Sequence, residues 1–527
     1  MFSADTPLVE AVNRHGGDGH SERLAALGRD AGTAAWRDRG MEANRDLPRL
    51  RTHDRYGNRV DEVEFHPAWH DLMRRSVEWG LHADPWVSGD KGAHVARAAG
   101  FITWTQVEPG HLCPISMTYA SVPALRRSGA DVAQWVEGLS ARSYDFGLRP
   151  AAQKTGLIAG MAMTEKQGGS DVRTNTTTAV VDDSGGYRLT GHKWFCSAPM
   201  SDVFLVLAQT PAGVTCFLVP RVLPDGSRNT FRIQRLKDKL GNRSNASSEI
   251  EFADTHAVRL GDEGRGVRTI VEMVSATRLD CVLGATGLMR GAISQAVWHA
   301  HNREAFGAAL IDKPLMRNVL ADLAVEAEAA TALAIRLAAA VDAAESGDES
   351  EALLRRIALP AAKFWTTKRS IVVTAEALEC LGGNGYAEES GMPLLYREAP
   401  VNSVWEGSGN VNALDLLRAM SREPGAVEAL IAELGTATGS DERYDAAVAE
   451  LLNEFADLGD LEFRARRLAE RIAVLLQAAQ LIKFAPSAVA DAFVVTRVAG
   501  DHGAQFGTLP RGLDLDAILH RADPIDA

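Results

Sequence analysis

The sequence predicts a mainly helical α+β protein with an N-terminal helical domain, a central antiparallel β domain, a C-terminal helix bundle and an extra helical tail domain. Its 527 residues exceed the size at which a single hydrophobic core stops growing, so several domains are expected. Short β-rich runs are confined to residues 176–260, and long segments rich in Ala, Leu, Arg and Glu follow them. We place the domains at residues 1–160, 161–262, 263–421 and 422–527.

The composition is that of an ordinary globular protein, with 46% hydrophobic and 24% charged residues. The formal net charge of −13 disfavours a general surface for polyanions. The five cysteines are odd in number and widely spaced, so we expect reduced thiols in a cytoplasmic protein and no metal site. No signal peptide and no apolar run of about 18 residues is evident, so we expect no membrane association.

The N-terminal region is expected to consist of helices and loops. Segments 69–79 and 131–144 place apolar residues at three- and four-residue spacing, which is typical of an amphipathic helix. His66 and His70 have the spacing of a ligand pair on a helix, but no carboxylate motif accompanies them. We therefore interpret them as structural residues.

The central region is expected to form a compact antiparallel barrel or sandwich, because its short strands are separated by turn signals such as Pro224-Asp-Gly-Ser. Strands are predicted at residues 177–181, 187–190, 203–208, 215–219, 231–235 and 248–252. The segment 261–266 resembles a nucleotide-binding loop but lacks a P-loop lysine. We interpret it as the connection from the β domain to the next helix.

The C-terminal half is expected to be helical, with bundle helices at residues 267–303, 314–344 and 351–381. Charged residues such as Glu326 and Arg336 interrupt the alanine-rich second segment, which indicates a packing helix rather than a membrane helix. A further helical tail is predicted from about residue 424 to residue 500.

Four motifs carry candidate chemistry. In residues 163–171, two glycines permit close approach of backbone amides to a ligand, and neighbouring hydroxyls add donors. Residues 191–199 hold an aromatic pair that can wall a planar ring. Residues 377–386 end a helix in glycines, and residues 405–410 set a carboxylate beside an aromatic. Taken singly, each motif fits an ordinary turn, core aromatic pair or helix cap.

The order and spacing of these motifs, with residues 239–244 and 303–307 between them, resemble the acyl-CoA dehydrogenase family. The resemblance covers about residues 60 to 420. It is strongest to the AidB-like branch, named after the bacterial adaptive response to DNA alkylation, through TEKQGGSDV, GHKWFCSAP, LKDKLGNRSNAS and PVNSVWEGSGN. That branch carries an additional C-terminal helical domain, in agreement with the predicted tail.

The resemblance implies FAD as the cofactor and a homotetramer as the assembly. The residues that it places around the flavin are Met163, Thr164, Gly168, Gly169, Ser170, Phe195, Ser197 and Ala198, with Val404, Gly407, Ser408 and Asn410 closing over the flavin and the acyl site. Those that it places at the adenine half of a neighbouring subunit's flavin are Arg303, Phe306, Glu379, Gly382 and Gly383. The family usually has Gln where this chain has Glu379.

The reaction implied by the resemblance is α,β-dehydrogenation of an acyl-CoA, which needs a base for the α-proton and a flavin as hydride acceptor. Glu406 is the candidate base, because a desolvated carboxylate can take that proton. Some dehydrogenases place the base directly before an arginine of the helix bundle. Here Thr277 precedes Arg278, and a threonine cannot act as that base. Trp405 replaces the usual Tyr and is expected to narrow the acyl pocket.

The AidB-like branch also implies weak acyl-CoA activity and binding of double-stranded DNA. Residues 421–527 hold 10 Lys+Arg against 18 Asp+Glu, a net charge of −8, which is the opposite of a DNA footprint. Arg464, Arg467 and Arg471 share one helix face and are the candidate DNA contacts. The alternative is ion pairing along the helix with Glu462 and Glu470.

Three function hypotheses stay open at this point. The first is a FAD-dependent dehydrogenase of the AidB type, with Glu406 as base. The second is a DNA-binding protective protein of the alkylation response whose flavin is secondary. The third is a specialised flavoenzyme that acts on a metabolite without CoA.

Overall fold

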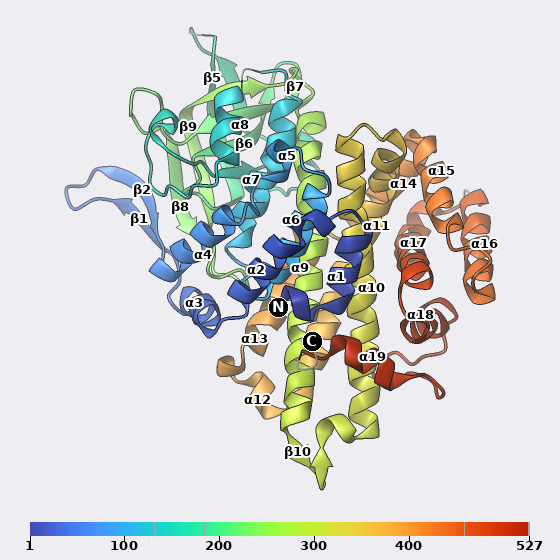
Figure 1. Ribbon diagram of the computed structural model, residues 1–527. Helices are drawn as coiled ribbons and strands as arrows, with labels where there is room; N and C mark the ends of the chain where they lie inside the picture. Colours follow the sequence, from blue (N-terminus) through green and yellow to red (C-terminus); the bar gives the residue numbers. More distant parts are fainter. Residues whose placement is uncertain (131, 184, 458, 525–527) are drawn as a thin grey trace. The chain divides into compact units, whose positions relative to one another are not determined.

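A computed structural model describes residues 1–524 except 131, 184 and 458. It divides into two compact units (Figure 1). The barrel unit contains residues 33–89 and 107–277, and the bundle unit contains residues 1–32, 90–106 and 278–527. The N-terminal residues are thus shared between the two units. The domain boundaries placed along the sequence remain a prediction.

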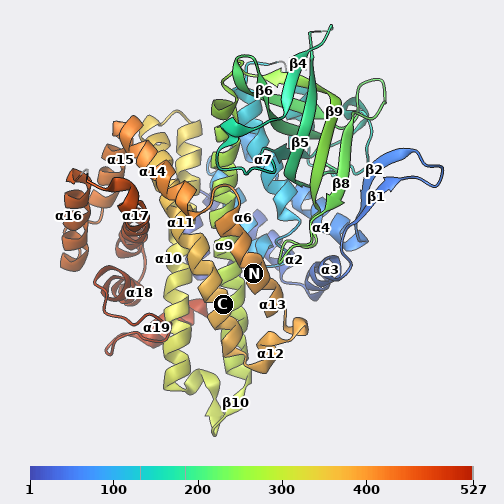
Figure 2. The ribbon, with the colours of Figure 1, turned by 180° about the vertical axis from the view of Figure 1, so that it is seen from behind.

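The barrel unit contains the expected central β domain. Its seven strands are β3 (Ala159–Ala162), β4 (Thr178–Val181), β5 (Tyr187–Ser197), β6 (Val203–Thr210), β7 (Gly213–Pro220), β8 (Phe231–Leu236) and β9 (Ser247–Leu260). The pairings run from β6 through β4, β5, β9 and β7 back to β6, so five strands close a barrel (Figure 2). β3 joins β6, and β8 joins β9.

Two features of this sheet differ from the prediction. β3 pairs with β6 in parallel, and the single residue pair that joins β4 to β6 is also parallel. A purely antiparallel sheet was expected. β3 itself was not predicted. Its four residues are all buried, so the strand has no polar alternation, and its Ala-Gly-Met-Ala sequence lacks the β-branched residues that usually indicate a strand.

The helices of the barrel unit are α3 (Ala34–Arg45), α4 (Pro67–Glu78), α5 (Pro85–Ser88), α7 (Leu112–Arg126) and α8 (Ala133–Ser140). α4 confirms the helix predicted at residues 69–79. α8 accounts for part of the segment predicted at 131–144, whose first residue lies outside the described residues. Nδ1 of His66 accepts the Ala68 N–H at the start of α4, and His70 hydrogen-bonds the Tyr144 hydroxyl, so both histidines have structural contacts.

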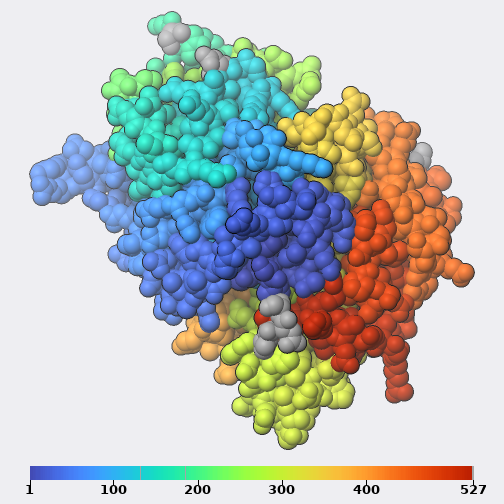
Figure 3. All heavy atoms as spheres, viewed as in Figure 1, coloured from blue at the N-terminus to red at the C-terminus, as the bar shows by residue number. Residues whose placement is uncertain are grey.

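The expectation that residues 1–160 contain only helices and loops is wrong at one place. β1 (Arg49–His53) and β2 (Arg59–Glu64) form an antiparallel hairpin that stands out from its unit (Figures 1 and 3). The strands are dominated by charged side chains, and a buried Asp61 takes an inward position, where its carboxylate accepts the Ile233 N–H. Because so few apolar residues alternate here, the strand signal was hidden.

The bundle unit is helical, as predicted. Its long helices are α9 (Gly266–Asn302, from residue 278 on), α10 (Pro314–Glu345) and α11 (Glu349–Cys380), and these confirm the three predicted bundle helices. α10 begins with a proline in its first turn, and the Asp348 carboxylate caps α11 by accepting the Glu351 N–H. The N-terminal helices α1 (Thr6–Arg14), α2 (Ser21–Ala31) and α6 (Ala93–Thr105) belong to the same unit.

α11 is the central helix of the bundle unit, since it packs against α10, α13 (Met392–Val404), α14 (Gly409–Arg422), α15 (Pro424–Gly435) and α17 (Leu461–Phe484). The helical tail is confirmed by α15, α16 (Glu442–Ala456), α17, α18 (Ser487–Phe493) and the π-helix Val494–Val498, and α19 (Leu515–Ala522) extends it. None of the helices in the described part of the chain combines the length and apolar composition that a bilayer crossing requires.

Candidate active site

The first group of candidate residues lies on a loop of the barrel unit, between β3 and β4. This loop is bound to β5 through its backbone: the Trp194 N–H donates to the Thr164 carbonyl at 2.8 Å, and the Lys166 N–H donates to Nε2 of His192 at 3.0 Å. A tight turn follows, closed by the Gly168 N–H on the Glu165 carbonyl. Gly168 has a φ of +130°, a conformation that side-chain-bearing residues rarely adopt.

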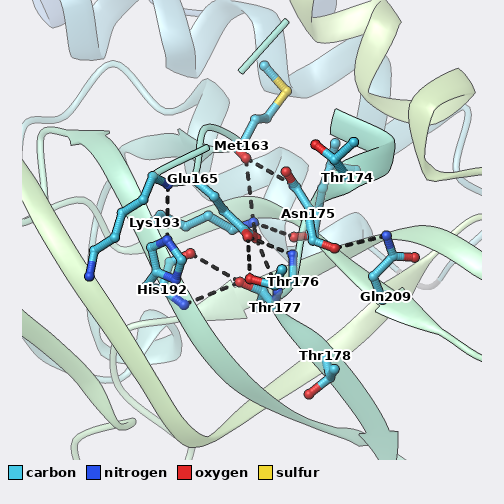
Figure 4. A network of polar contacts seen from close by, with 12 residues as sticks. Met163, Glu165, Thr174, Asn175, Thr176, Thr177, Thr178, His192, Lys193 and Gln209 are labelled. Carbon is cyan, nitrogen blue, oxygen red and sulfur yellow. Dashed lines mark hydrogen bonds and ion pairs between the residues drawn. The ribbon is translucent and has the colours of Figure 1, made fainter. Parts of the chain in front are cut away.

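A buried ion pair holds the inner side of this loop (Figure 4). Lys193 Nζ lies 2.7 Å from Glu165 Oε1 and also donates to the Leu207 carbonyl at 2.7 Å. The Glu165 carboxylate accepts the N–H groups of Thr176 and Thr177 as well. The loop is therefore connected to β5 and β6 of the barrel.

Burial and pairing act on the two charges in opposite directions. Burial lowers the pKa of Lys193 to about 8, although Glu165 opposes that shift. For Glu165, burial would raise the pKa, but the Lys193 ammonium and the hydrogen bonds outweigh it and hold the pKa below its ordinary value. The sequence reasoning missed this pair. The available signal was the alternation of β5, in which Tyr187, Leu189 and Lys193 take inward positions.

The outer side of the loop has the features of an anion-binding surface. A Cβ at Gly169 would lie 2.3 Å from Oγ1 of Thr164, so a side chain there would force Thr164 or the loop to shift. Among the described residues, no protein acceptor lies within hydrogen-bond distance of the backbone N–H groups of Gly169 and Ser170, and both residues are exposed. Free N–H groups in a glycine turn are suited to phosphate oxygens.

The aromatic motif lies at the end of β5 in the same unit. The Phe195 side chain is 50% exposed, although it is a large apolar group. Beyond it, the hydroxyls of Ser197 and Ser247 are 3.1 Å apart, and Ala198 has a φ of +50° while its N–H donates to the Ala246 carbonyl. A half-exposed aromatic ring beside a constrained backbone is suited to stacking against a planar ligand. These residues and the loop fit a flavin nucleotide.

The candidate base belongs to the bundle unit. Glu406 lies between α13 and α14 with a φ of +55°, in the left-handed region that glutamate rarely adopts. Its carbonyl accepts Nε of Arg278 at 2.9 Å. Lys363 donates to the carbonyls of Trp405 and Gly407, and burial lowers the pKa of Lys363 to about 8, against the influence of Cys281 and Glu406. Backbone strain of this kind is concentrated at functional sites.

The remaining flavin candidates of the bundle unit are on its surface. Val404 is 65% exposed, and Ser408 and Asn410 are also exposed, with Arg466 donating to the Asn410 side chain at 3.3 Å. The hydroxyl of Thr277 donates to carbonyls of its own helix. Arg418 is exposed and lies 3.5 Å from the Asp415 carboxylate.

The residues expected at the adenine half of a flavin are exposed at helix ends of the bundle unit. Arg303 follows α9, and Phe306 forms the turn of the short hairpin between β10 (Glu304–Ala305) and β11 (Ala308–Ala309). Phe306 is 95% exposed with a φ of +52°. Glu379 lies in the last turn of α11, and Gly382 and Gly383 follow it. All five residues are accessible to a ligand or to a second chain.

The three tail arginines lie on α17 and face carboxylates of the preceding segment and of α16. Arg471 pairs with Glu450 and Glu454 at 2.6 and 2.7 Å, and Arg467 pairs with Glu454 at 3.2 Å. Arg464 lies 3.4 Å from Asp457. The predicted partners Glu462 and Glu470 were wrong, because the neighbouring helix brings its own carboxylates to this face.

Three family models match the chain. "Adaptive response protein AidB N-terminal domain" matches residues 1–146, "Acyl-CoA dehydrogenase, middle domain" residues 160–255 and "Acyl-CoA dehydrogenase, C-terminal domain" residues 264–421. Together with the order of helices, β domain and bundle, they define the class of flavin-dependent oxidoreductases that act on CH–CH bonds. The chain belongs to the acyl-CoA dehydrogenase family, and within that family it is of the AidB type.

The similarity to individual proteins supports this assignment. The chain is 47% identical to AidB of Escherichia coli (strain K12), over 94% of this chain and 91% of that protein. The crystal structure of Caenorhabditis elegans ACDH-11 in complex with C11-CoA matches with a TM-score of 0.86 at 28% identity, over 98% of this chain and 92% of that one. A glutaryl-CoA dehydrogenase from Mycobacterium smegmatis in complex with FADH2 shares the fold, with a TM-score of 0.60 at 20% identity, over 78% and 96% of the two chains.

Proposed function

We propose that the chain binds FAD and removes hydrogen from the α and β carbons of an acyl-CoA thioester, with Glu406 as the base. The observation that carries the proposal is the conformation of Glu406. Arg278 donates to the carbonyl of Glu406 itself and Lys363 to the carbonyls on either side, so the glutamate, at a φ of +55°, is presented in a defined position. A base has to meet the α-proton with such a defined geometry.

The residues for FAD fall into separate groups in the two units. In the barrel unit, the N–H groups of Gly169 and Ser170 would receive the pyrophosphate, and Phe195, Ser197 and Ala198 would face the ring system. In the bundle unit, Arg303, Phe306, Glu379, Gly382 and Gly383 would bind the adenine half of a flavin held by a second chain. Bound FAD supplies the acceptor for the β-hydride. The relative from Mycobacterium smegmatis carries FADH2 in its solved structure, which supports this choice of cofactor.

We propose a low turnover with simple acyl-CoA substrates. Trp405 occupies the position before the base, and its indole N–H donates to the Asn402 side chain at 3.3 Å, which holds the large ring in place. A fixed indole leaves less room beside Glu406 than a smaller ring would. A metabolite without CoA remains the alternative substrate class, and a panel that includes both classes separates the two.

A homotetramer is proposed from the exposed apolar residues of the bundle unit. Phe306 is 95% exposed, Leu315 and Tyr386 are each 83% exposed, and Trp298 is 55% exposed. Large apolar side chains at such exposure are typical of surfaces that a further subunit covers.

A cytoplasmic location remains a prediction from the sequence. The five cysteines, all within described residues, form no disulfide.

The competing hypothesis is a DNA-binding protein of the alkylation response. Its candidate contacts have less support, because Arg464, Arg467 and Arg471 already face Asp457, Glu454 and Glu450. Binding of a phosphate backbone would have to displace these carboxylates on a tail with a net charge of −8. We therefore rank dehydrogenation above DNA binding.

The experiment is anaerobic bleaching of the purified protein. Wild-type protein should be yellow, and its flavin absorbance should fall with at least one member of a panel of acyl-CoA thioesters. Glu406→Gln should stay yellow but lose bleaching by about three orders of magnitude or more. Glu428→Gln, an exposed glutamate of α15, is the control and should bleach as wild type does.

Three outcomes contradict the proposal. A colourless protein that cannot be reconstituted with FAD would show that the chain does not use this cofactor. No bleaching by any thioester, together with bleaching by a metabolite without CoA, moves the chain to the third hypothesis. Salt-sensitive binding of a fluorescent duplex that Arg467→Glu weakens, in a protein that no member of the panel bleaches, supports the DNA hypothesis instead.

A further inference from the structure

The segment 405–408, which carries the candidate base, has an unusual set of hydrogen bonds. Each of its carbonyl oxygens accepts from a side chain. Lys363 Nζ donates to the carbonyls of Trp405 at 2.8 Å and Gly407 at 2.5 Å, and Arg278 Nε donates to that of Glu406 at 2.9 Å. Nδ2 of Asn412 donates to the carbonyls of Gly407 and Ser408 at 2.6 and 3.0 Å.

The donors come from three different helices, so the segment is held from several directions. Lys363 lies on α11, Arg278 on α9 and Asn412 on α14. Arg278 is itself fixed, because the Asp415 carboxylate accepts from it at 2.5 Å and pairs with Arg356 at 3.1 Å. Arg278 therefore binds the segment from a position that is itself constrained.

Among the three donors, Lys363 carries its charge at the greatest energetic cost. Its side chain is 1% exposed, and the two acceptors that the structure places on its ammonium are neutral carbonyl oxygens. A buried ammonium whose hydrogen-bond acceptors are neutral carbonyls is energetically expensive, so an apolar residue of the same length would be favoured if Lys363 only filled space. The lysine instead spans the base, with one donor to the residue before Glu406 and one to the residue after it.

The geometry on both sides of Glu406 shows what this spanning contact does. Glu406 has a φ of +55° and Gly407 a φ of +99°, so two successive residues are in the left-handed region. A Cβ at Gly407 would lie 3.3 Å from Arg278 Nη2, so the backbone approaches that guanidinium closely. Without the cations, Glu406 would relax toward an ordinary φ, and its side chain would then leave from a different direction.

We propose that Lys363 is a positioning residue for the base: its buried ammonium, with Arg278 and Asn412, holds the carbonyls of 405–408 and thereby keeps Glu406 in the left-handed conformation that presents its carboxylate. This inference rests on the proposed function, in which Glu406 removes the α-proton. Lys363 exchanges no proton with the substrate and touches no reacting atom.

The test uses the full-length, FAD-loaded protein and the variant Lys363→Met, which keeps the length of the side chain and removes its charge and donors. Thr374→Val is the matched control, because Thr374 is a buried polar residue of the same helix whose hydroxyl bonds only within that helix. Hydrogen exchange of amides 405–409 should be about tenfold faster in Lys363→Met and unchanged in the control.

Kinetics of bleaching by the best acyl-CoA of the panel separate positioning from general damage. In Lys363→Met the limiting rate constant should fall by about 100-fold, while the concentration giving half the limiting rate changes by less than about threefold. The flavin absorbance spectrum should remain that of wild type. If Lys363→Met does not fold, Arg278→Met takes its place, since a methionine there donates to neither the Glu406 carbonyl nor Asp415, and the same pattern is expected.

Wild-type exchange at amides 405–409 with a wild-type limiting rate overturns the inference. An unchanged limiting rate with a large rise in the half-saturating concentration also overturns it, because that result assigns Lys363 to substrate binding. If no thioester bleaches the wild-type protein, the proposed function fails, and the exchange rates alone then decide whether Lys363 holds the segment.

Discussion

Lys193 Nζ lies 2.7 Å from Glu165 Oε1 inside the barrel unit, and both side chains are completely buried. The pair joins the loop that carries Thr164, Gly169 and Ser170 to the interior of the barrel. A buried ion pair gains little over an apolar pair, but removal of one partner leaves an uncompensated charge in a medium of low polarity. The conformation of the candidate flavin loop therefore depends on two charges buried inside the barrel unit.

Removal of either charge should loosen this loop. We expect Glu165→Gln and Lys193→Met each to destabilise the barrel unit by about 3–5 kcal/mol, and the double variant to cost less than the sum of the two. The measurement is thermal unfolding with release of flavin fluorescence as a second signal. Lys166→Met, which removes an exposed lysine next to Glu165, is the control. Additive losses in the double variant would show that the two charges act independently.

A methyl group at Gly169 should weaken FAD binding. The added Cβ would lie 2.3 Å from Thr164 Oγ1, so the loop must shift, and such overpacking costs about 1–3 kcal/mol. Titration of the apoprotein with FAD should show a dissociation constant raised by roughly one order of magnitude in Gly169→Ala. Gly19→Ala, at a position with nothing within 4 Å of the added carbon, should bind as wild type does. Equal affinity in both variants would remove this loop from the flavin site.

Acid should release the tail from the bundle through Glu326. Its carboxylate pairs with Arg369 at 2.9 Å and Arg497 at 3.1 Å. Burial would raise the pKa of Glu326, but the two guanidinium groups outweigh it and lower the pKa to about 2. Because this folded-state pKa is below the ordinary value of 4.5, the stabilisation is complete above pH 4.5 and is lost as the pH falls toward 2.

Glu326→Gln should therefore lower the stability of the folded protein at neutral pH and have little effect on it in acid. We expect a loss of about 3–5 kcal/mol at pH 7 and a difference from wild type that narrows steadily below pH 4.5. Hydrogen exchange of residues 494–498, measured from pH 7 to pH 3, checks the trend. Glu428→Gln should show no such difference, and a gap that widens in acid would reverse the assigned sign.

Phe306 should be required for assembly. Its ring is 95% exposed at the tip of a two-stranded hairpin, and we expect Phe306→Ser to shift the protein from a tetramer of 56.6 kDa chains toward smaller species. Light scattering after size exclusion gives the mass directly. Phe463→Ser removes another aromatic that is 92% exposed, on α17, and should leave the mass unchanged. A monomeric wild-type protein would contradict the proposed tetramer.

Much of the fold could be predicted because its signals are local. The long helices α9, α10 and α11 were expected within three residues of their observed ends, since their composition and capping residues are short-range features. β5 was predicted only as residues 187–190 but runs to Ser197, because the polar and aromatic residues after Thr190 hide its alternation. The hairpin β1–β2 was missed for a related reason, since charged side chains occupy its exposed positions.

The candidate site was predicted as a set of motifs, and its supporting residues were not. Thr164, Gly169, Phe195 and Glu406 stand in recognisable local patterns. Lys193 and Lys363 do not, because a lysine in a sequence is most often an exposed residue. Nothing local distinguishes Lys363 from the exposed Lys166, and only the alternation of β5 sets Lys193 apart.

The local patterns of the sequence were sufficient for the class of fold, the order of its parts and the motif that contains Glu406, because periodicity and turn chemistry act over a few residues. Only the tertiary structure decided which charges are buried and which backbone groups they hold. Arg278 meets the Glu406 carbonyl across 128 residues of chain, and Lys363 meets that of Trp405 across 42. Contacts at such separations are set by the packing of whole helices. The same packing brings the carboxylates of α16 to Arg467 and Arg471, which the sequence analysis had named as candidate DNA contacts.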